Sequence, residues 1–213
     1  GFGFTLTGGS ALHIIRMEPA ARAALLRELF ATDCTNIGIR YLRYGPPIHR
    51  TWIGDGRHDW AFADETYADL YRRNIVPITD LCHFGVPDWI GSFQNGDFPE
   101  RFAAYARAFA ERFPWVQLYT PVNEMFVCAT FSAAYGWWNE QRTDDRSFVT
   151  ALKHIVKANV LAMQAIDNSM KLVFKRRWWW PFGKSLTSDW GDQKPPPTFM
   201  PSAHDVAERL ARK

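Results

Sequence analysis

The pair Asn123-Glu124 is the part of this sequence with the clearest potential for chemistry. It follows directly on residues 116–122, an apolar run whose composition suits a strand buried on both faces. A carboxylate can donate or accept a proton, and a neighbouring amide can hydrogen-bond a substrate. Active sites of open α/β sheets and β/α barrels lie at the carboxyl ends of strands. The position of the pair therefore predicts a catalytic or binding site at this strand end.

A second strand-like run also ends in titratable groups. Residues 75–81 are rich in β-formers, and Asp80, Cys82 and His83 lie at the end of this run. It precedes the first run by about forty residues, which is the length of one β/α unit. If the two strands are parallel neighbours, His83 and Glu124 are expected at the same edge of the sheet.

The elements that position these residues alternate along the chain. Strands are expected at residues 37–44, 75–81 and 116–122. Segments with helical spacing of apolar residues fill the gaps and follow the third strand, at residues 19–30, 62–73, 98–113 and 147–166. Regular alternation of strand and helix predicts an α/β fold with a parallel sheet, and the leading form is a (β/α)₈ TIM barrel.

Three segments occur in the order and spacing of a known family. They are residues 40–44 (Arg-Tyr-Leu-Arg-Tyr), 80–87 (Asp-Leu-Cys-His-Phe-Gly-Val-Pro) and 121–125 (Pro-Val-Asn-Glu-Met). They resemble the segments Arg-Phe-Ser-x-Ser-Trp, Tyr-His-Trp-Asp-Leu-Pro and Thr-Phe-Asn-Glu-Pro of family 1 glycoside hydrolases, the β-glucosidase family. The resemblance runs over residues 37–166. It implies hydrolysis of the O-glycosidic bonds of β-glycosides with retention of configuration, with a sugar or glycoside as ligand.

The resemblance also implies roles for single residues. Glu124 corresponds to the catalytic acid/base, Asn123 to a donor to the sugar 2-hydroxyl, and His83 to a partner of another sugar hydroxyl. Arg40 corresponds to the arginine near the nucleophile. Trp138 belongs to a segment expected to line the barrel mouth, where aromatic rings stack on sugar faces.

Each of these roles has a structural alternative. Glu124 suits a helix cap or a surface ion pair as well, and His83 suits a core histidine whose ring is satisfied by the backbone. An ion pair with an acid such as Asp80 is the alternative for Arg40. Asp80 itself stands at a threonine position of the family and is expected to be a structural partner.

The sequence also departs from the family pattern. Phe84, Gly85 and Met125 stand where the family has Trp, Asp and Pro. Residues 1–18 do not supply the Gln-x-Glu-Gly segment of the first strand, and no Glu-Asn-Gly segment with the nucleophile follows Glu124. Glu140 is the nearest later carboxylate, but it has no family counterpart.

Length predicts that the barrel is incomplete. A β/α barrel typically needs about 250 residues, and this chain has 213. We expect about four to five β/α units in residues 1–174, with an open sheet edge that permits self-association. Residues 175–213 form an atypical tail rich in Trp and Pro, expected to be poorly ordered; a disrupted reading frame is the alternative.

Composition fits a soluble enzyme or a piece of one. Hydrophobic residues make up 47 % and charged residues 22 %, and the net charge is only +3, which does not imply nucleic acid. No apolar run is long enough to cross a membrane. The three cysteines, Cys34, Cys82 and Cys128, lack metal-site spacing, which indicates reduced thiols in a cytoplasmic protein and predicts no metal or cofactor.

Three functions stay open on the sequence alone. The first is a retaining β-glycosidase, and the second is a catalytically inactive sugar-binding or vestigial half-barrel. The third is binding to a membrane or nucleic acid through the basic, Trp-rich segment at residues 171–180.

Overall fold

The structure is a computed structural model that describes residues 3–5, 8–138 and 140–178. The chain divides into two units, Gly1–Phe174 and Lys175–Lys213. Of the second unit only residues 175–178 are described, as the end of the last helix. The expectation about the Trp- and Pro-rich tail therefore lies almost wholly outside the described residues.

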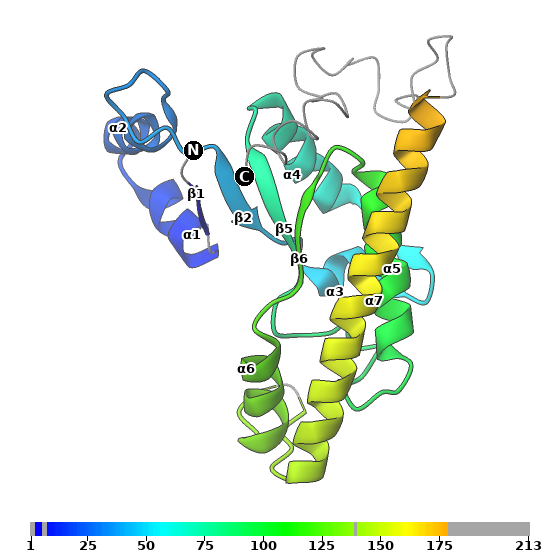
Figure 1. Cartoon of the computed structure of the whole chain (residues 1–213). Helices are drawn as coiled ribbons and strands as arrows, with labels where there is room; N and C mark the ends of the chain where they lie inside the picture. The colour runs from blue at the N-terminus through cyan, green and yellow to red at the C-terminus, as the bar shows by residue number, and fades with distance from the viewer. Residues whose placement is uncertain (1–2, 6–7, 139, 179–213) are drawn as a thin grey trace. The chain divides into compact units, whose positions relative to one another are not determined.

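A parallel sheet forms the centre of the first unit (Figure 1). Its four strands run in the order β1-β2-β5-β6, and every neighbouring pair is parallel. The strands are β1 (Gly3–Thr5), β2 (Tyr41–Tyr44), β5 (Val76–Cys82) and β6 (Leu118–Val122). The three expected strands are thus adjacent, parallel and in sequence order, which confirms the α/β prediction. Within the described residues the sheet does not close into a barrel.

Helices follow the strands as the alternation predicts. They are α1 (Gly8–Arg16), α2 (Pro19–Phe30), α4 (Ala61–Arg72), α5 (Phe98–Arg112) and α7 (Asp145–Trp178). Shorter elements are α3 (Ile48–Thr51), α6 (Met125–Ala129), the π-helix η1 (Thr130–Ala134) and the antiparallel strands β3 (Trp52–Gly54) and β4 (Arg57–His58). Strand β1 and the β3–β4 pair are not predicted from the sequence, because these strands are only two or three residues long.

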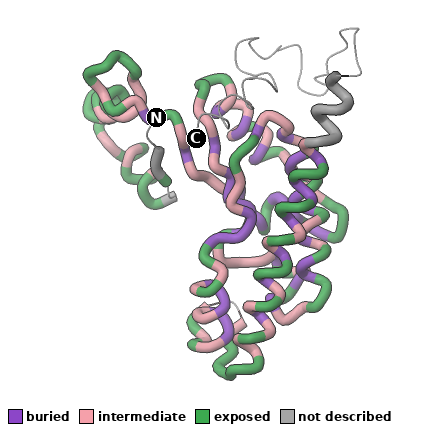
Figure 2. Tube along the Cα trace, viewed as in Figure 1, coloured by how far each residue is buried: buried purple, intermediate pink, exposed green. Residues whose placement is uncertain are grey.

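Local sequence explains where the helices begin and which face they bury. At the start of α2 the Glu18 carboxylate accepts hydrogen bonds from the backbone of Ala20 and Ala21, and Pro19 occupies the first turn. Helix α5 buries one apolar face, which includes Phe98, Phe102, Tyr105, Ala106 and Phe109. By contrast, α2 has no buried residue (Figure 2).

Aromatic rings join the helices to the sheet. Trp52 is 1 % exposed and stacks on Tyr105 of α5, with ring centroids 5.3 Å apart. Tyr67 of α4 stacks on Phe113 at 4.8 Å, and its hydroxyl lies 2.9 Å from the Thr79 hydroxyl on β5. This core supports β5, the strand that carries Asp80 and leads into His83.

Candidate active site at the carboxyl ends of the strands

Strand register brings the two functional segments together. Asp80 is paired with Thr120, and Cys82 with Val122. The Asn123 backbone N–H then donates to the Cys82 carbonyl at 3.0 Å, one residue beyond the end of β6. Asn123 and His83 therefore follow directly on two hydrogen-bonded strands at the same edge of the sheet.

Arg43 links three strands at this edge. From β2 its Nη2 atom donates to Asp80 Oδ2 on β5 at 2.8 Å and to Oδ1 of Asn123 after β6. Asp80 and Asn123 are 4 % and 2 % exposed. Their polar atoms need such partners because unpaired buried polar groups are costly.

Gly45 lets β2 approach β5 closely enough for this contact. A Cβ atom at position 45 would lie only 2.0 Å from the Asp80 carbonyl oxygen. Only glycine fits there, so the small residue after Arg43-Tyr44 is a requirement of the site's backbone.

His83 completes the network from the solvent side. Its Nδ1 atom lies 2.7 Å from Asp80 Oδ2, while about half of its side chain is exposed. Burial raises the pKa of the Asp80 carboxyl above its usual value, and the His83 hydrogen bond and the charge of Arg43 oppose that rise. A buried carboxyl thus holds one ring nitrogen of a half-exposed histidine.

Because burial raises the pKa of Asp80, the free energy of unfolding should depend on pH. A carboxyl whose pKa is raised by folding contributes most stability below its unfolded pKa, and that contribution is lost as pH rises through the folded pKa. We therefore expect the free energy of unfolding of the protein with Asp80, relative to that of Asp80→Asn, to increase as the pH is lowered from neutral toward the usual pKa of an aspartate, about 4. Urea unfolding of both proteins measures the difference, with His83→Asn present in each so that the histidine does not titrate. A difference that stays constant or moves the other way would contradict the raised pKa.

Glu124 has an unusual backbone conformation. Its φ of 42° and ψ of 59° are left-handed, and its side chain makes no capping bond to α6, the helix that it precedes. Phe84, which follows His83, has a φ of 68°. Such conformations cost a non-glycine residue about 1–3 kcal/mol and cluster at functional sites. Phe84 and Glu124 are each the second residue after a strand end, and the exposed Glu124 carboxylate makes no capping bond.

Trp138 lies in an aromatic cluster beside this edge. Its ring contacts Phe84 and Phe131, each with centroids 4.7 Å apart, and Phe84 contacts His83 at 4.5 Å. Trp137, by comparison, is 65 % exposed. The aromatic contacts connect the segment after η1 to the residue next to His83.

Glu140 has structural partners. Its Oε1 atom accepts from the Phe93 backbone N–H at 2.5 Å, and Oε2 accepts from the Gln94 side chain at 2.7 Å. His154 of α7 binds the Phe93 carbonyl from the other side at 2.6 Å. Glu140 therefore joins its own loop to the loop that contains Phe93 and Gln94.

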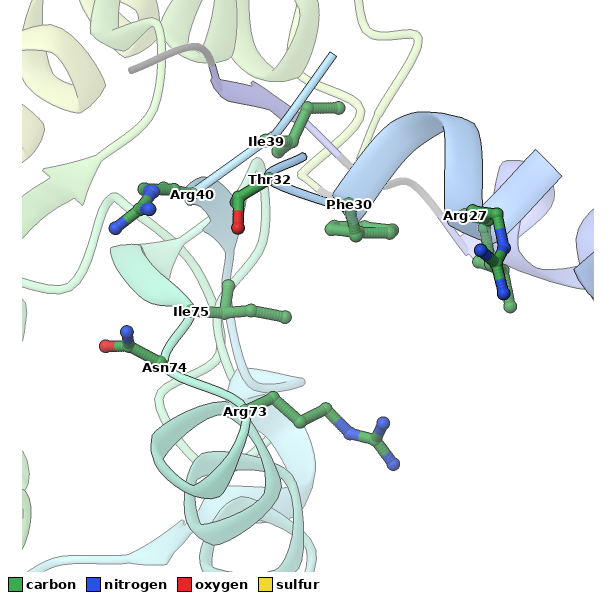
Figure 3. Close-up of a pocket in the computed structure, with 9 residues that line it drawn as sticks. Arg27, Phe30, Thr32, Ile39, Arg40, Arg73, Asn74 and Ile75 are labelled. Atoms are coloured by element: carbon green, nitrogen blue, oxygen red, sulfur yellow. The ribbon is translucent and has the colours of Figure 1, made fainter. Parts of the chain in front are cut away.

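Arg40 lies away from this network. It precedes β2, is exposed, and lines a cavity of about 740 Å³ at the amino ends of β2 and β5. Figure 3 shows that the Arg40 and Arg73 side chains point away from one another there, so these two cations do not face one ligand. The structure brings Arg43 to the place expected for Arg40.

The sequence around Arg43 also fits the family's segment. An arginine followed by a tyrosine occurs twice, at residues 40–41 and 43–44, and both fit the family's Arg-Phe pair. The second copy is also followed by the small residue Gly45, in the place of the family's serine. Asp80 was recognised only as an ion-pair partner, and its contact with His83 was not foreseen.

No helix in residues 3–5, 8–138 or 140–178 is long and apolar enough to cross a membrane. In the same part of the chain, no group of three or more His, Cys, Asp and Glu side chains could hold a metal ion.

Comparison with known proteins identifies the family of the chain. The model of glycosyl hydrolase family 1 matches residues 55–189, more than half of the chain. A 6-phospho-beta-galactosidase from Streptococcus mutans is 29 % identical over 103 residues, which are 47 % of this chain and 21 % of that protein. A protein named cholesterol oxidase from Acinetobacter baumannii is 40 % identical over only 52 residues, 24 % of this chain and 9 % of its own length.

Solved structures show the same fold. A beta-glucosidase from Thermotoga maritima aligns with a TM-score of 0.60 at 22 % identity, covering 63 % of this chain and 33 % of that one. The AHE enzyme from Alicyclobacillus herbarius aligns with a TM-score of 0.60 at 27 % identity, covering 68 % and 33 %. The chain thus spans about a third of the length of these structures, with the parallel β/α units of a barrel that is not closed. With two of the family's segments placed at adjacent strand ends and its model matched over more than half of the chain, the chain belongs to glycosyl hydrolase family 1.

Proposed function

We propose that this chain supplies the acid/base half of a retaining β-glycosidase active site. The observation that carries the proposal is Asn123-Glu124 at the end of β6, beside His83 at the end of β5. Glu124 is exposed and does not cap α6, so its carboxyl is available to a ligand.

The roles follow from the chemistry of retention. One carboxyl protonates the leaving oxygen and later activates water, while a second attacks the anomeric carbon, and the two are about 5–5.5 Å apart. Glu124 takes the first role. Asn123 and His83 hold sugar hydroxyls, and Trp138 with Phe84 provides an apolar wall for the sugar ring.

Among the described residues, no second carboxylate is free to act as the nucleophile at this edge of the sheet. Asp80 is buried and bonded to Arg43 and His83, and Glu140 is bonded to Phe93 and Gln94. We infer that a complete site takes its nucleophile from further strands of the barrel. Strand β6 has no partner on its outer edge among the described residues, so such strands would pair there. A second copy of the chain at that edge is the alternative arrangement.

A sugar-binding role without turnover is the second candidate, and the same observation favours it. With both other carboxylates engaged, Glu124 alone can bind and protonate but cannot form a glycosyl intermediate. Both candidates predict that the chain recognises a glycoside, and they differ in whether a nucleophile is supplied.

Binding of glucoimidazole tests the shared part of the proposal. A Thermotoga maritima beta-glucosidase similar to this chain has been solved with this compound. We expect isothermal titration to show binding, because the basic imidazole accepts a proton from an acid placed at the glycosidic oxygen. Glu124→Gln should weaken it about tenfold to a hundredfold, since a hydrogen bond to a charged group contributes about 1.5–3 kcal/mol.

Glu111→Gln is the matched control, because Glu111 is an exposed glutamate on α5 away from the strand ends. It should leave the affinity unchanged. If the wild-type chain does not bind, or if both variants weaken binding equally, the proposed site is wrong.

A further inference from the structure

We propose that Asp80 is a positioning residue that determines which atoms of the two sugar-binding side chains donate hydrogen bonds and which accept them. It acts on His83 directly and on Asn123 through Arg43. The inference rests on the proposed function for the identity of the ligand, but its geometry is independent of it. One oxygen, Asp80 Oδ2, receives both Arg43 Nη2 at 2.8 Å and His83 Nδ1 at 2.7 Å.

The first step concerns the proton on Asp80 Oδ2. A guanidinium has only donors, so Oδ2 must act as an acceptor toward Arg43. A proton on the oxygen that faces this positive charge is disfavoured. The carboxyl oxygen is therefore an acceptor toward His83 as well, and His83 must carry its ring proton on Nδ1.

The second step concerns the free nitrogen of His83. A neutral imidazole has one donor and one acceptor nitrogen, and the bond made by one nitrogen fixes the role of the other. With Nδ1–H donated to Asp80, Nε2 of the half-exposed ring presents a lone pair. It accepts a hydrogen bond from a ligand hydroxyl.

The third step concerns Asn123. Arg43 donates to the Asn123 side chain, so the atom that faces the guanidinium must be the amide oxygen. The amide's two N–H donors are then left for another acceptor, such as a ligand hydroxyl oxygen. Because Arg43 is held by Asp80, the carboxylate determines which way the amide points.

The arrangement selects a ligand with a specific pattern of hydroxyl groups. His83 requires a hydroxyl that donates, and Asn123 requires a hydroxyl oxygen that accepts. Asp80 touches neither hydroxyl; it acts through the two side chains. Asp80 Oδ1 is buried without a hydrogen-bond partner among the described residues. An unpaired buried polar atom costs free energy of folding, so filling space does not by itself account for a carboxylate at this position.

The tautomer of His83 in the ligand-free chain tests the inference. Long-range ¹H–¹⁵N spectra at about pH 8, where an ordinary imidazole is neutral, distinguish protonation at Nδ1 from protonation at Nε2. The His83 signals are identified by their loss in His83→Gln. We expect wild-type His83 to be protonated at Nδ1.

Two substitutions at Asp80 separate positioning from general support of the fold. Asp80→Asn keeps an acceptor oxygen and should retain the Nδ1–H tautomer. Asp80→Ala removes the acceptor and should move the proton to Nε2, with about tenfold weaker glucoimidazole binding from the lost orientation. Asp69→Ala is the matched control, because Asp69 pairs with Arg72 and Arg73 on the surface of α4. It should change neither the tautomer nor the binding.

Two results would overturn the inference. One is a wild-type His83 protonated at Nε2, which needs no variant to fold. The other is a folded Asp80→Ala protein that keeps the Nδ1–H tautomer. The spectra are recorded without sugar, so the tautomer tests the role of Asp80 independently of ligand binding. If the chain shows the Nδ1–H tautomer but does not bind glucoimidazole, the proposed function is rejected and the role of Asp80 is not.

Discussion

Replacing Arg43 by alanine is expected to destabilise the fold by about 3 kcal/mol. Arg43 provides the positive charge beside Asp80, which is only 4 % exposed. Without it the carboxylate keeps its desolvation cost but loses its charged partner, and Asn123 loses the donor to its amide oxygen. Urea unfolding at neutral pH measures the change in the free energy of unfolding.

A double-variant cycle separates this charge effect from loss of packing. In a chain that already carries Asp80→Ala, the further change Arg43→Ala should cost much less, because no buried carboxylate is left unpaired. Arg40→Ala is the matched control. Arg40 is exposed and one residue outside β2, so its loss should change stability by less than about 0.5 kcal/mol. Equal costs with and without Asp80 would contradict the role given to this ion pair.

The chain alone is expected to form no covalent glycosyl intermediate. Retention requires a nucleophile about 5–5.5 Å from the acid/base, and the described residues provide one uncommitted carboxylate at the strand ends, Glu124. General acid assistance by Glu124 is worth about 10²–10⁴-fold at most, and an aryl glycoside with a good leaving group benefits little from it. Treatment with a 2-fluoro-glycosyl inactivator should therefore leave the intact mass of the chain unchanged.

A complete family 1 β-glucosidase is the positive control for that labelling experiment. Turnover should show no burst, and Glu124→Gln should hardly change the slow background hydrolysis of the aryl glycoside. A labelled carboxylate in this chain, or hydrolysis with retention that Glu124→Gln abolishes for poor leaving groups, would show that a nucleophile is present. The sugar-binding alternative would then be dropped in favour of an active enzyme.

Much of the fold was predictable because the signals are local. The helix at Pro19–Phe30 has the expected bounds, and α4 and α5 begin or end within one residue of the expected positions. Apolar residues at helical spacing and a proline in the first turn fix such elements without knowledge of the rest of the chain. Strands β1 and β3–β4 were missed because two or three residues carry no periodicity.

The local sequence predicts that Asn123-Glu124 follows one strand and that His83 follows the neighbouring one, but the strand before Asn123 is buried only at Pro121 and Val122, not along its whole length. The sequence did not determine which arginine joins them. Arg40 precedes β2, whereas Arg43 lies within it, and the register of β2 against β5 places Arg43 opposite Ile78, two residues before Asp80.

The hydrogen-bond partners of the acidic side chains also depend on the tertiary structure. Asp80 meets Arg43 across 37 residues, and Glu140 meets Phe93 across 47. Contacts over such distances depend on how strands and loops pack, and no spacing in the sequence encodes them. The motif therefore predicts where a site would lie, while packing engages Asp80 and Glu140 with other partners and leaves Glu124 as an exposed carboxylate after the end of β6.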